Sequence, residues 1–161
     1  KSLDFIGLRG LSLVCNAAYI HSRVRFEEGA PERDRPLAGQ SPYLVNAGLF
    51  YQHDDKRIFA SLLYNRIAKR IESVGVPMQD QNEDIPDIYE MPRNSLDLTF
   101  SKKIGKAVEI KAGIQDMLNS KIEYKQFVKL TDQNGGKRER EQLVRSYRPG
   151  VDINVGVSLK F

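Results

Sequence analysis

The side chains best suited to binding chemistry form a basic cluster near the end of the chain. Its five members are Lys137, Arg138, Arg140, Arg145 and Arg148. Two acids, Glu139 and Glu141, interrupt the cluster. Guanidinium and ammonium groups form strong, charge-assisted hydrogen bonds with phosphate and carboxylate oxygens. The cluster is therefore a candidate contact for an anionic group, and a solvated surface loop is the alternative.

No combination of side chains predicts catalysis, a metal site or a bound cofactor. The two histidines, His21 and His53, fall on different expected strands near opposite ends, and His53 begins a polar turn. The sequence contains no nucleophile–base arrangement and no glycine-rich phosphate loop. The single cysteine, Cys15, excludes an internal disulfide and argues against a structural zinc site. We therefore expect a protein that is not an enzyme.

Composition leaves two structural classes open. The chain carries 25 basic and 21 acidic residues, spread along its 161 residues. Nucleic-acid binding needs basic residues gathered on one face with aromatic residues between them, so we expect no nucleic-acid partner. No apolar run approaches the ~18 residues of a membrane helix. A membrane-spanning strand shows only every second residue to lipid, so the mean hydropathy of −0.47 fits a β-barrel as well as a soluble domain.

The end of the chain alternates strictly between apolar and polar residues. The apolar positions are Val151, Ile153, Val155, Val157, Leu159 and Phe161. The positions between them are Asp152, Asn154, Gly156, Ser158 and Lys160. Successive side chains of a strand point to opposite sides, so this segment predicts a strand with one apolar and one polar face. A sheet packed on a soluble core shows the same alternation.

Seven strands are expected, and the links between them alternate in length. The expected strands are 1–6, 11–26, 40–52, 57–73, 94–103, 107–127 and 150–161. Tight turns at 7–10, 53–56 and 104–106 alternate with long polar connections at 27–39, 74–93 and 128–149. Membrane barrels carry short turns on one rim and long loops on the other. The sequence therefore favours a barrel over a soluble sandwich.

Strand length and tyrosine placement agree with a membrane barrel. Two expected strands reach about 15 residues, beyond the usual length in soluble domains, and no amphipathic helix is expected to cover the apolar face. Five tyrosines lie at or toward strand ends, where amphipathic rings favour a bilayer interface: Tyr19, Tyr43, Tyr51, Tyr64 and Tyr89. The fold class that we expect is all-β, an antiparallel transmembrane β-barrel segment over residues 1–161.

The last eight residues resemble the C-terminal assembly signal of bacterial outer-membrane barrels. That signal has a polar residue, a glycine, a hydrophobic residue and a terminal aromatic residue at fixed spacing. Asn154, Gly156, Leu159 and Phe161 occupy these four positions. The resemblance implies that the last strand is presented to the assembly machinery and later closes the barrel seam.

Two further segments resemble TonB-dependent outer-membrane receptors. Residues 35–48, RPLAGQSPYLVNAG, look like the loop-to-strand entry that recurs late in these barrels. Residues 111–122, KAGIQDMLNSKI, are similar to the "N-L-x-D/N-x-x-Y" segment of their penultimate strand. Asp116 stands where asparagine is commoner, and the tyrosine position falls on Glu123 or Tyr124.

The resemblance implies an active transporter for a nutrient such as an iron chelate, a glycan or a peptide. The chain would supply about the last six to seven strands of a 22-stranded barrel, without the plug domain and the earlier strands. It begins at Lys1 without a signal peptide or start methionine, so we expect it to be part of a longer protein. The implied partners are the rest of the barrel with its plug, a periplasmic energy-coupling protein, outer-membrane lipid with lipopolysaccharide, and a surface lipoprotein.

Family topology implies a bacterial outer-membrane location with the C-terminus toward the periplasm. The long connections then face outside, where the basic cluster would meet lipopolysaccharide phosphates or an anionic ligand. The middle connection is acidic, with Asp80, Glu83, Asp84, Asp87 and Glu90. Polar residues of the inner face are candidates for plug contact: Asp97, Glu109, Lys111, Asp152 and Lys160. A passive pore or other outer-membrane barrel and a soluble β-sheet binding domain are the alternatives.

Overall fold

The computed structural model describes residues 9–29, 34–76, 85–131 and 137–159. In these ranges the protein is all-β and antiparallel, as the sequence predicts, and it contains no helix. The strands are β1 (Leu11–Tyr19), β2 (Tyr43–His53), β3 (Ile58–Ile67), β4 (Arg70–Ser73), β5 (Ile88–Glu90), β6 (Arg93–Ile104), β7 (Val108–Gln115), β8 (Ile122–Thr131), β9 (Lys137–Tyr147) and β10 (Asp152–Leu159).

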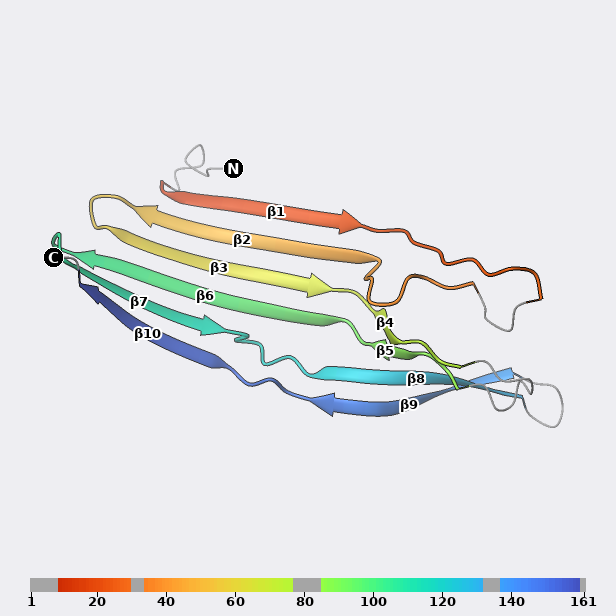
Figure 1. Cartoon of the computed structure of the whole chain (residues 1–161). Coiled ribbons are helices and arrows are strands. Elements are labelled where there is room, and N and C mark those ends of the chain that lie inside the picture. Colours follow the sequence, from red (N-terminus) through yellow and green to blue (C-terminus); the bar gives the residue numbers. More distant parts are fainter. Residues whose placement is uncertain (1–8, 30–33, 77–84, 132–136, 160–161) are drawn as a thin grey trace.

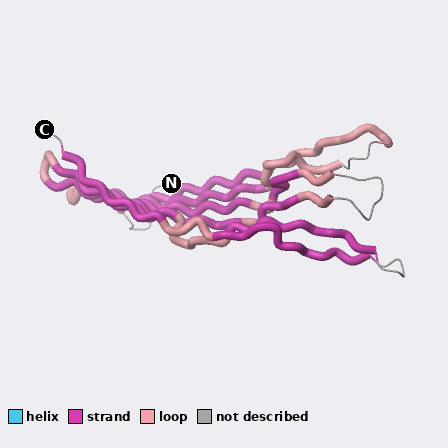
Figure 2. Tube along the Cα trace, turned by 60° about the horizontal axis from the view of Figure 1, so that its bottom comes forward, coloured by secondary structure: helices cyan, strands magenta, loops and turns pink. Residues whose placement is uncertain are grey.

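Six of these strands form one antiparallel sheet in the order β1-β2-β3-β6-β7-β10. The other four form a second antiparallel sheet, β4-β5-β8-β9, which lies beyond one end of the first (Figure 1). The tight turns at 54–57 and 105–107 lie at the opposite end, which we call the tight-turn end. Figure 2 shows a single curved layer of strands with no helix packed against it.

The second sheet continues the strands of the first after short interruptions. Residues 68–69 separate β3 from β4, and residues 91–92 separate β6 from β5. Pro92 has no N–H group to donate to a ladder, which explains a gap in strand pairing there. Residues 116–121 separate β7 from β8, and 148–151 separate β9 from β10. Positive φ angles at Asp116, Asn119 and Gly150, of 50°, 43° and 94°, account for these two interruptions.

Six of the seven expected strands are present, but their ends differ. The strand expected at 11–26 ends at Tyr19, and a single antiparallel bridge between Val24 and Arg35 follows it. The strands expected at 57–73 and 107–127 are each divided in two by the interruptions. Those expected at 40–52 and 94–103 shift by one to three residues at their ends, and the one expected at 150–161 begins at Asp152. The segment expected at 1–6 lies outside the described residues, as do Lys160 and Phe161.

The prediction of a long loop over residues 128–149 is wrong. β8 extends to Thr131, and Lys137–Tyr147 form β9, which pairs with β8 from Lys137 to Tyr147. The segment lacks the apolar alternation by which the other strands were predicted, because its alternating residues are mostly charged. Its backbone pairing with β8 stabilises it instead.

The register of the six-stranded sheet sorts its side chains onto two faces. Leu13, Leu49, Leu62, Leu98, Ile114 and Ile153 lie opposite one another in a continuous row across all six strands. We call this side the apolar face. The chain neighbours of these residues form a second row, whose side chains point to the opposite side of the sheet. This row consists of Ser12, Phe50, Ser61, Thr99, Gly113 and Asn154, and we call its side the polar face.

Candidate functional site

The apolar face is largely uncovered. Among the described residues the buried hydrophobic side chains are Ala68, Ile71, Ile122 and Tyr124, and none of them belongs to the six-stranded sheet. By contrast, Ile153, Val155, Val157 and Leu159 of β10 are 61–73% exposed. Soluble monomers rarely expose apolar patches of this extent. The sheet therefore presents a broad apolar surface that requires an apolar environment.

Aromatic and polar side chains border the apolar face at the end away from the tight turns. Tyr19 lies opposite Tyr43, whereas Tyr64 lies opposite Ala47, four residues farther along β2. The Tyr64 hydroxyl donates to Asn94 Oδ1 at 2.9 Å, and Arg66 donates to the same oxygen at 3.0 Å. Amphipathic rings at these positions suit a boundary between apolar and polar surroundings. Of the five tyrosines singled out in the sequence, Tyr51 lies at the tight-turn end and Tyr89 lies in β5.

The polar face carries a row of carboxamides and a flat aromatic ring. Asn16, Asn46 and Asn65 lie directly opposite one another, and the Asn65 amide donates to the Asn46 carbonyl oxygen. One row away, the Phe50 ring lies over Gly48, where an added Cβ would be 2.7 Å from Phe50 Cε2. A shallow hollow of about 300 Å³ lies among these residues. This face can form hydrogen bonds and apolar contacts with a neighbour.

The charged residues predicted to point inward do lie on the polar face. Asp97, Glu109, Lys111 and Asp152 alternate with the apolar row on their strands. The Lys111 ammonium lies 3.4 Å from the Glu109 carboxylate, so part of this charge is compensated within the wall. Lys160, the fifth of these residues, lies outside the described residues.

Three of the four residues that resemble an assembly signal lie along β10, an edge strand of the six-stranded sheet. The Asn154 side chain covers Gly113, which has no side chain to obstruct it. Gly156 lies opposite Lys111 on the polar face, and Leu159 lies opposite Val108 on the apolar face, 61% exposed. Phe161 lies outside the described residues.

Asp116, in the segment that resembles TonB-dependent receptors, sits at the interruption after β7. Its φ of 50° is a left-handed conformation that asparagine and aspartate adopt more readily than other side chains. Its backbone N–H donates to Asp97 Oδ1 at 2.8 Å, and the Met117 N–H donates to the Leu96 carbonyl at 2.8 Å. An aspartate at this position therefore adopts the required backbone conformation at low steric cost.

The alternation of the six-stranded sheet shifts by one residue where the second sheet begins. Beside β3 and in β6, the Ala68 N–H donates to the Tyr43 carbonyl toward β2, and the Lys103 N–H donates to the Arg57 carbonyl toward β3. Beyond the interruption, the Ile71 carbonyl accepts from Gly39 on the β2 side, and the Met91 N–H donates to the Glu123 carbonyl on β8. Odd-numbered residues of both strands therefore point the opposite way, so Arg70 and Glu90 lie on the side of the polar face. Glu90 pairs with Tyr124, and Tyr124 with Arg145, so these residues share that side.

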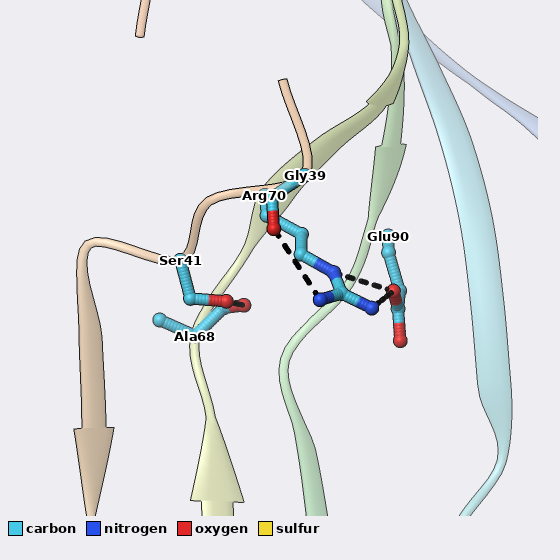
Figure 3. Close-up of polar contacts among 5 residues, drawn as sticks. All are labelled: Gly39, Ser41, Ala68, Arg70 and Glu90. Carbon is cyan, nitrogen blue, oxygen red and sulfur yellow. Dashed lines mark hydrogen bonds and ion pairs between the residues drawn. The ribbon is translucent and has the colours of Figure 1, made fainter. Parts of the chain in front are cut away.

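Glu90, which pairs with Arg70, has the least exposed charged side chain among the ion pairs of the described residues. The Arg70 guanidinium lies 2.6 Å from the Glu90 carboxylate, whose side chain is 9% exposed (Figure 3). Arg70 also donates to the Gly39 carbonyl at 3.4 Å, and the nearby Ser41 hydroxyl donates to the Ala68 carbonyl at 3.3 Å. This network ties the chain before β2 to the second sheet. Glu90 was expected in a long acidic loop over residues 74–93, and its place in β5 corrects that prediction.

The remaining acids of that expected loop are only partly described. Asp87 accepts a hydrogen bond from the Gly75 N–H at 2.8 Å, which joins the two arms of the connection. Asp80, Glu83 and Asp84 lie outside the described residues.

The basic cluster lies mainly in a strand, and a β-bulge in that strand determines which side each basic side chain faces. Lys137, Arg138, Arg140 and Arg145 belong to β9, and Arg148 follows it and donates to the Asn119 carbonyl at 2.7 Å. Tyr124 pairs with Arg145 but Lys125 pairs with Leu143, so Val144 is left over between them. The extra residue shifts the alternation and brings Arg145 to the same side as Arg138 and Arg140.

The acids of β9 lie on the opposite side, among lysines. Glu141 lies 2.6 Å from the Lys125 ammonium, which also lies 3.1 Å from Glu123, and Glu123 lies 2.7 Å from Lys121. Hydrogen bonds from Lys121 and then Lys125 lower the pKa of Glu123, and bonds to Glu141 and Glu123 raise the pKa of Lys125. The stability that the Glu123 ion pairs add to the folded state is lost as pH falls through the lowered pKa of Glu123. The stability that Lys125 adds is lost as pH rises through the raised pKa of Lys125.

Aromatic rings hold a cation on each side of the second sheet. On the side of Lys125, the Lys69 ammonium lies 4.2 Å from the Tyr89 ring centre and 3.7 Å from that of Phe127. On the other side, the Arg145 guanidinium lies 4.2 Å from the Tyr124 ring centre. Tyr124 and Tyr147 stack with their ring centres 6.5 Å apart, and burial raises the pKa of Tyr124. These contacts fix Arg145 in place.

The histidines do not share a site. His53 ends β2 at the tight-turn end, whereas His21 follows β1 at the other end of the sheet. In the part of the chain that the structure describes, no three His, Cys, Asp or Glu side chains gather in a way that could hold a metal ion.

Comparisons with protein-family models, with curated proteins and with solved structures gave no match to this chain. Within the described ranges, no helix is long and apolar enough to cross a membrane.

Replacing Arg70 with glutamine should lower the free energy of unfolding by about 2–4 kcal/mol, because the Glu90 carboxylate would be left buried without its partner. Guanidinium titration in detergent micelles, followed by circular dichroism, measures this. The exposed pair Arg23–Asp34, at 2.9 Å and with side chains 57% and 36% exposed, is the matched control. Arg23→Gln should cost less than about 1 kcal/mol. Equal losses in the two variants would contradict the assigned role of Glu90.

Proposed function

We propose that this chain forms part of the wall and the extracellular extensions of a TonB-dependent outer-membrane transporter. The observation that carries the proposal is the apolar face, an aliphatic row across six strands without a buried hydrophobic core beneath it. Lipid is the environment that suits such a surface, because the hydrocarbon of a bilayer accepts every second side chain of a barrel strand. A soluble β domain would have to bury this face.

The two edges of the six-stranded sheet support its being part of a larger barrel. In the described part of the chain, β1 pairs only with β2, and β10 pairs only with β7. Unpaired backbone groups cannot remain open within a bilayer, since no water is there to satisfy them. Further strands on both edges would close the wall, and a 22-stranded barrel is the size that the family resemblance implies.

The polar face would line the interior. Its asparagine row, its charged residues and the hollow beside Phe50 suit contact with a plug domain and with water. Energy for uptake of an iron chelate, glycan or peptide would reach the plug through the periplasmic coupling protein. A surface lipoprotein could cover the outer side.

The tight-turn end is proposed to face the periplasm, together with the C-terminus. Short turns occupy that rim in outer-membrane barrels, and the longer extensions of the opposite end face outside. The second sheet would then rise above the outer leaflet.

Cysteine labelling tests this orientation. In a Cys15→Ser background, Val144→Cys on β9 should react with a membrane-impermeant maleimide on intact cells, since Val144 is exposed on the proposed outer extension. Lys106→Cys, in a tight turn, should react only after the outer membrane is permeabilised. The two variants serve as controls for each other. Reaction of Lys106→Cys on intact cells, or of neither variant under any condition, would contradict the proposal.

A passive pore is the second candidate, because an apolar face and an open polar interior suit it equally. Conductance across a planar bilayer separates the two functions in the complete protein that carries this chain. A transporter closed by a plug should show no stable open current, whereas a passive pore should show steady conductance steps. Steady steps would overturn the transporter proposal and leave the barrel standing.

A further inference from the structure

One side of β9 carries three arginines and neither of the two acids of that strand. Arg138 and Arg140 alternate with Glu139 and Glu141, and the bulge of β9 brings Arg145 to the side of the other two arginines. The acids point to the opposite side, where Glu141 takes part in an ion pair. The strand therefore separates positive from negative charge between its two sides, and we call the positive one the arginine side of β9.

Backbone pairing connects the arginine side of β9 to the polar face. Glu90 lies on the side of the polar face, it pairs with Tyr124 of β8, and Tyr124 pairs with Arg145. Residues directly opposite each other in a ladder share one side of the sheet. The polar face of the six-stranded sheet thus continues onto the arginine side of β9. In the proposed transporter this surface faces the interior at the outer end of the wall, where a ligand enters.

The three arginines are available to a partner. Arg138, Arg140 and Arg145 are exposed, and within the described ranges none of them forms an ion pair. On the same side, Glu90 is already occupied by its own ion pair. The Arg145 guanidinium lies 4.2 Å from the Tyr124 ring centre, which holds it in position before a ligand arrives.

The spacing of the arginines restricts the shape of the ligand. A strand rises by about 3.3 Å per residue, so Arg138 and Arg140 lie about 7 Å apart along β9. Arg140 pairs with Val128 and Arg145 with Tyr124, four residues away on β8, which corresponds to about 13 Å. A compact anion can reach one of these guanidinium groups at a time. An extended ligand with several negative charges can reach all three.

We propose that the arginine side of β9 binds an extended ligand with carboxylate groups along its length as that ligand enters the barrel. This inference rests on the proposed function and names the substrate class of the transporter. Each planar guanidinium can donate two parallel hydrogen bonds to a different carboxylate of the same chain. Of the nutrients considered, glycans and peptides are extended, and both carry carboxylates in their acidic forms. Lys137 and Arg148, the other members of the basic cluster, are not required.

The test measures binding of short acidic chains to the complete detergent-solubilised protein by isothermal titration calorimetry. Hexagalacturonate represents an acidic oligosaccharide and hexaglutamate an acidic peptide, while maltohexaose is an uncharged chain of matching length. At least one acidic hexamer should bind, and the variant Arg138→Gln/Arg140→Gln/Arg145→Gln should bind it at least about tenfold more weakly. Maltohexaose and monomeric galacturonate should bind at least about tenfold more weakly than that hexamer.

The matched control removes three positive charges from the tight-turn end. The variant Lys56→Gln/Lys103→Gln/Lys106→Gln loses the same charge as the arginine variant and should bind the acidic hexamer as the unaltered protein does. A comparison of the two variants separates contact with the arginine side of β9 from a general effect of net charge.

Three results would overturn the inference. The first is that neither acidic hexamer binds. The second is equal affinity in the arginine and lysine variants, which would show that the arginines are not the contact. The third is equal binding of the acidic hexamer and either maltohexaose or monomeric galacturonate, which would exclude recognition of an extended polycarboxylate. Labelling of Val144→Cys and the bilayer conductance test the proposed function separately, so a failure confined to the hexamers overturns this inference alone.

Discussion

Backbone hydrogen bonds between six antiparallel strands keep every second side chain on the same side of the sheet. A slip of one residue at any ladder would carry the aliphatic row from Leu13 to Ile153 onto the opposite face. The register holds across five successive ladders, and the apolar face and the polar face both depend on it. The pairing itself stabilises this sheet, since none of the buried hydrophobic side chains among the described residues belongs to it.

The interruptions between the two sheets shift the alternation of the strands by one residue. Pro92 removes one backbone donor, and the Met91 N–H donates to β8 where the alternation of β6 would point it toward β3. Arg70 and Glu90 still pair, but on the side of the polar face. The Arg70–Glu90 pair and the cation–aromatic contacts of Lys69 and Arg145 lie just beyond these interruptions. Polar and cation–aromatic contacts thus accompany the buried Ile71 and Ile122 where the strands enter the second sheet.

The sequence predicted the strands whose alternation is apolar against polar. It located β10, β6 and β7 closely because Val, Ile and Leu at every second position leave little choice of register. It failed at β9, where the alternation is between arginine and glutamate and hydropathy shows no period. Alternation in the sign of charge was the available clue. The bulge at Val144 and the Arg70–Glu90 pair depend on long-range pairing, which no local pattern reveals.

The central claim is that the apolar face contacts lipid, and Cys15 provides a direct probe because it is the single cysteine and lies exposed on that face. A nitroxide attached to Cys15 in membranes should collide readily with oxygen and poorly with a water-soluble nickel chelate. In a Cys15→Ser/Asn16→Cys variant, one residue along the strand, the preference should reverse. Greater access of the nickel chelate to Cys15, or the same access at both positions, would contradict the account.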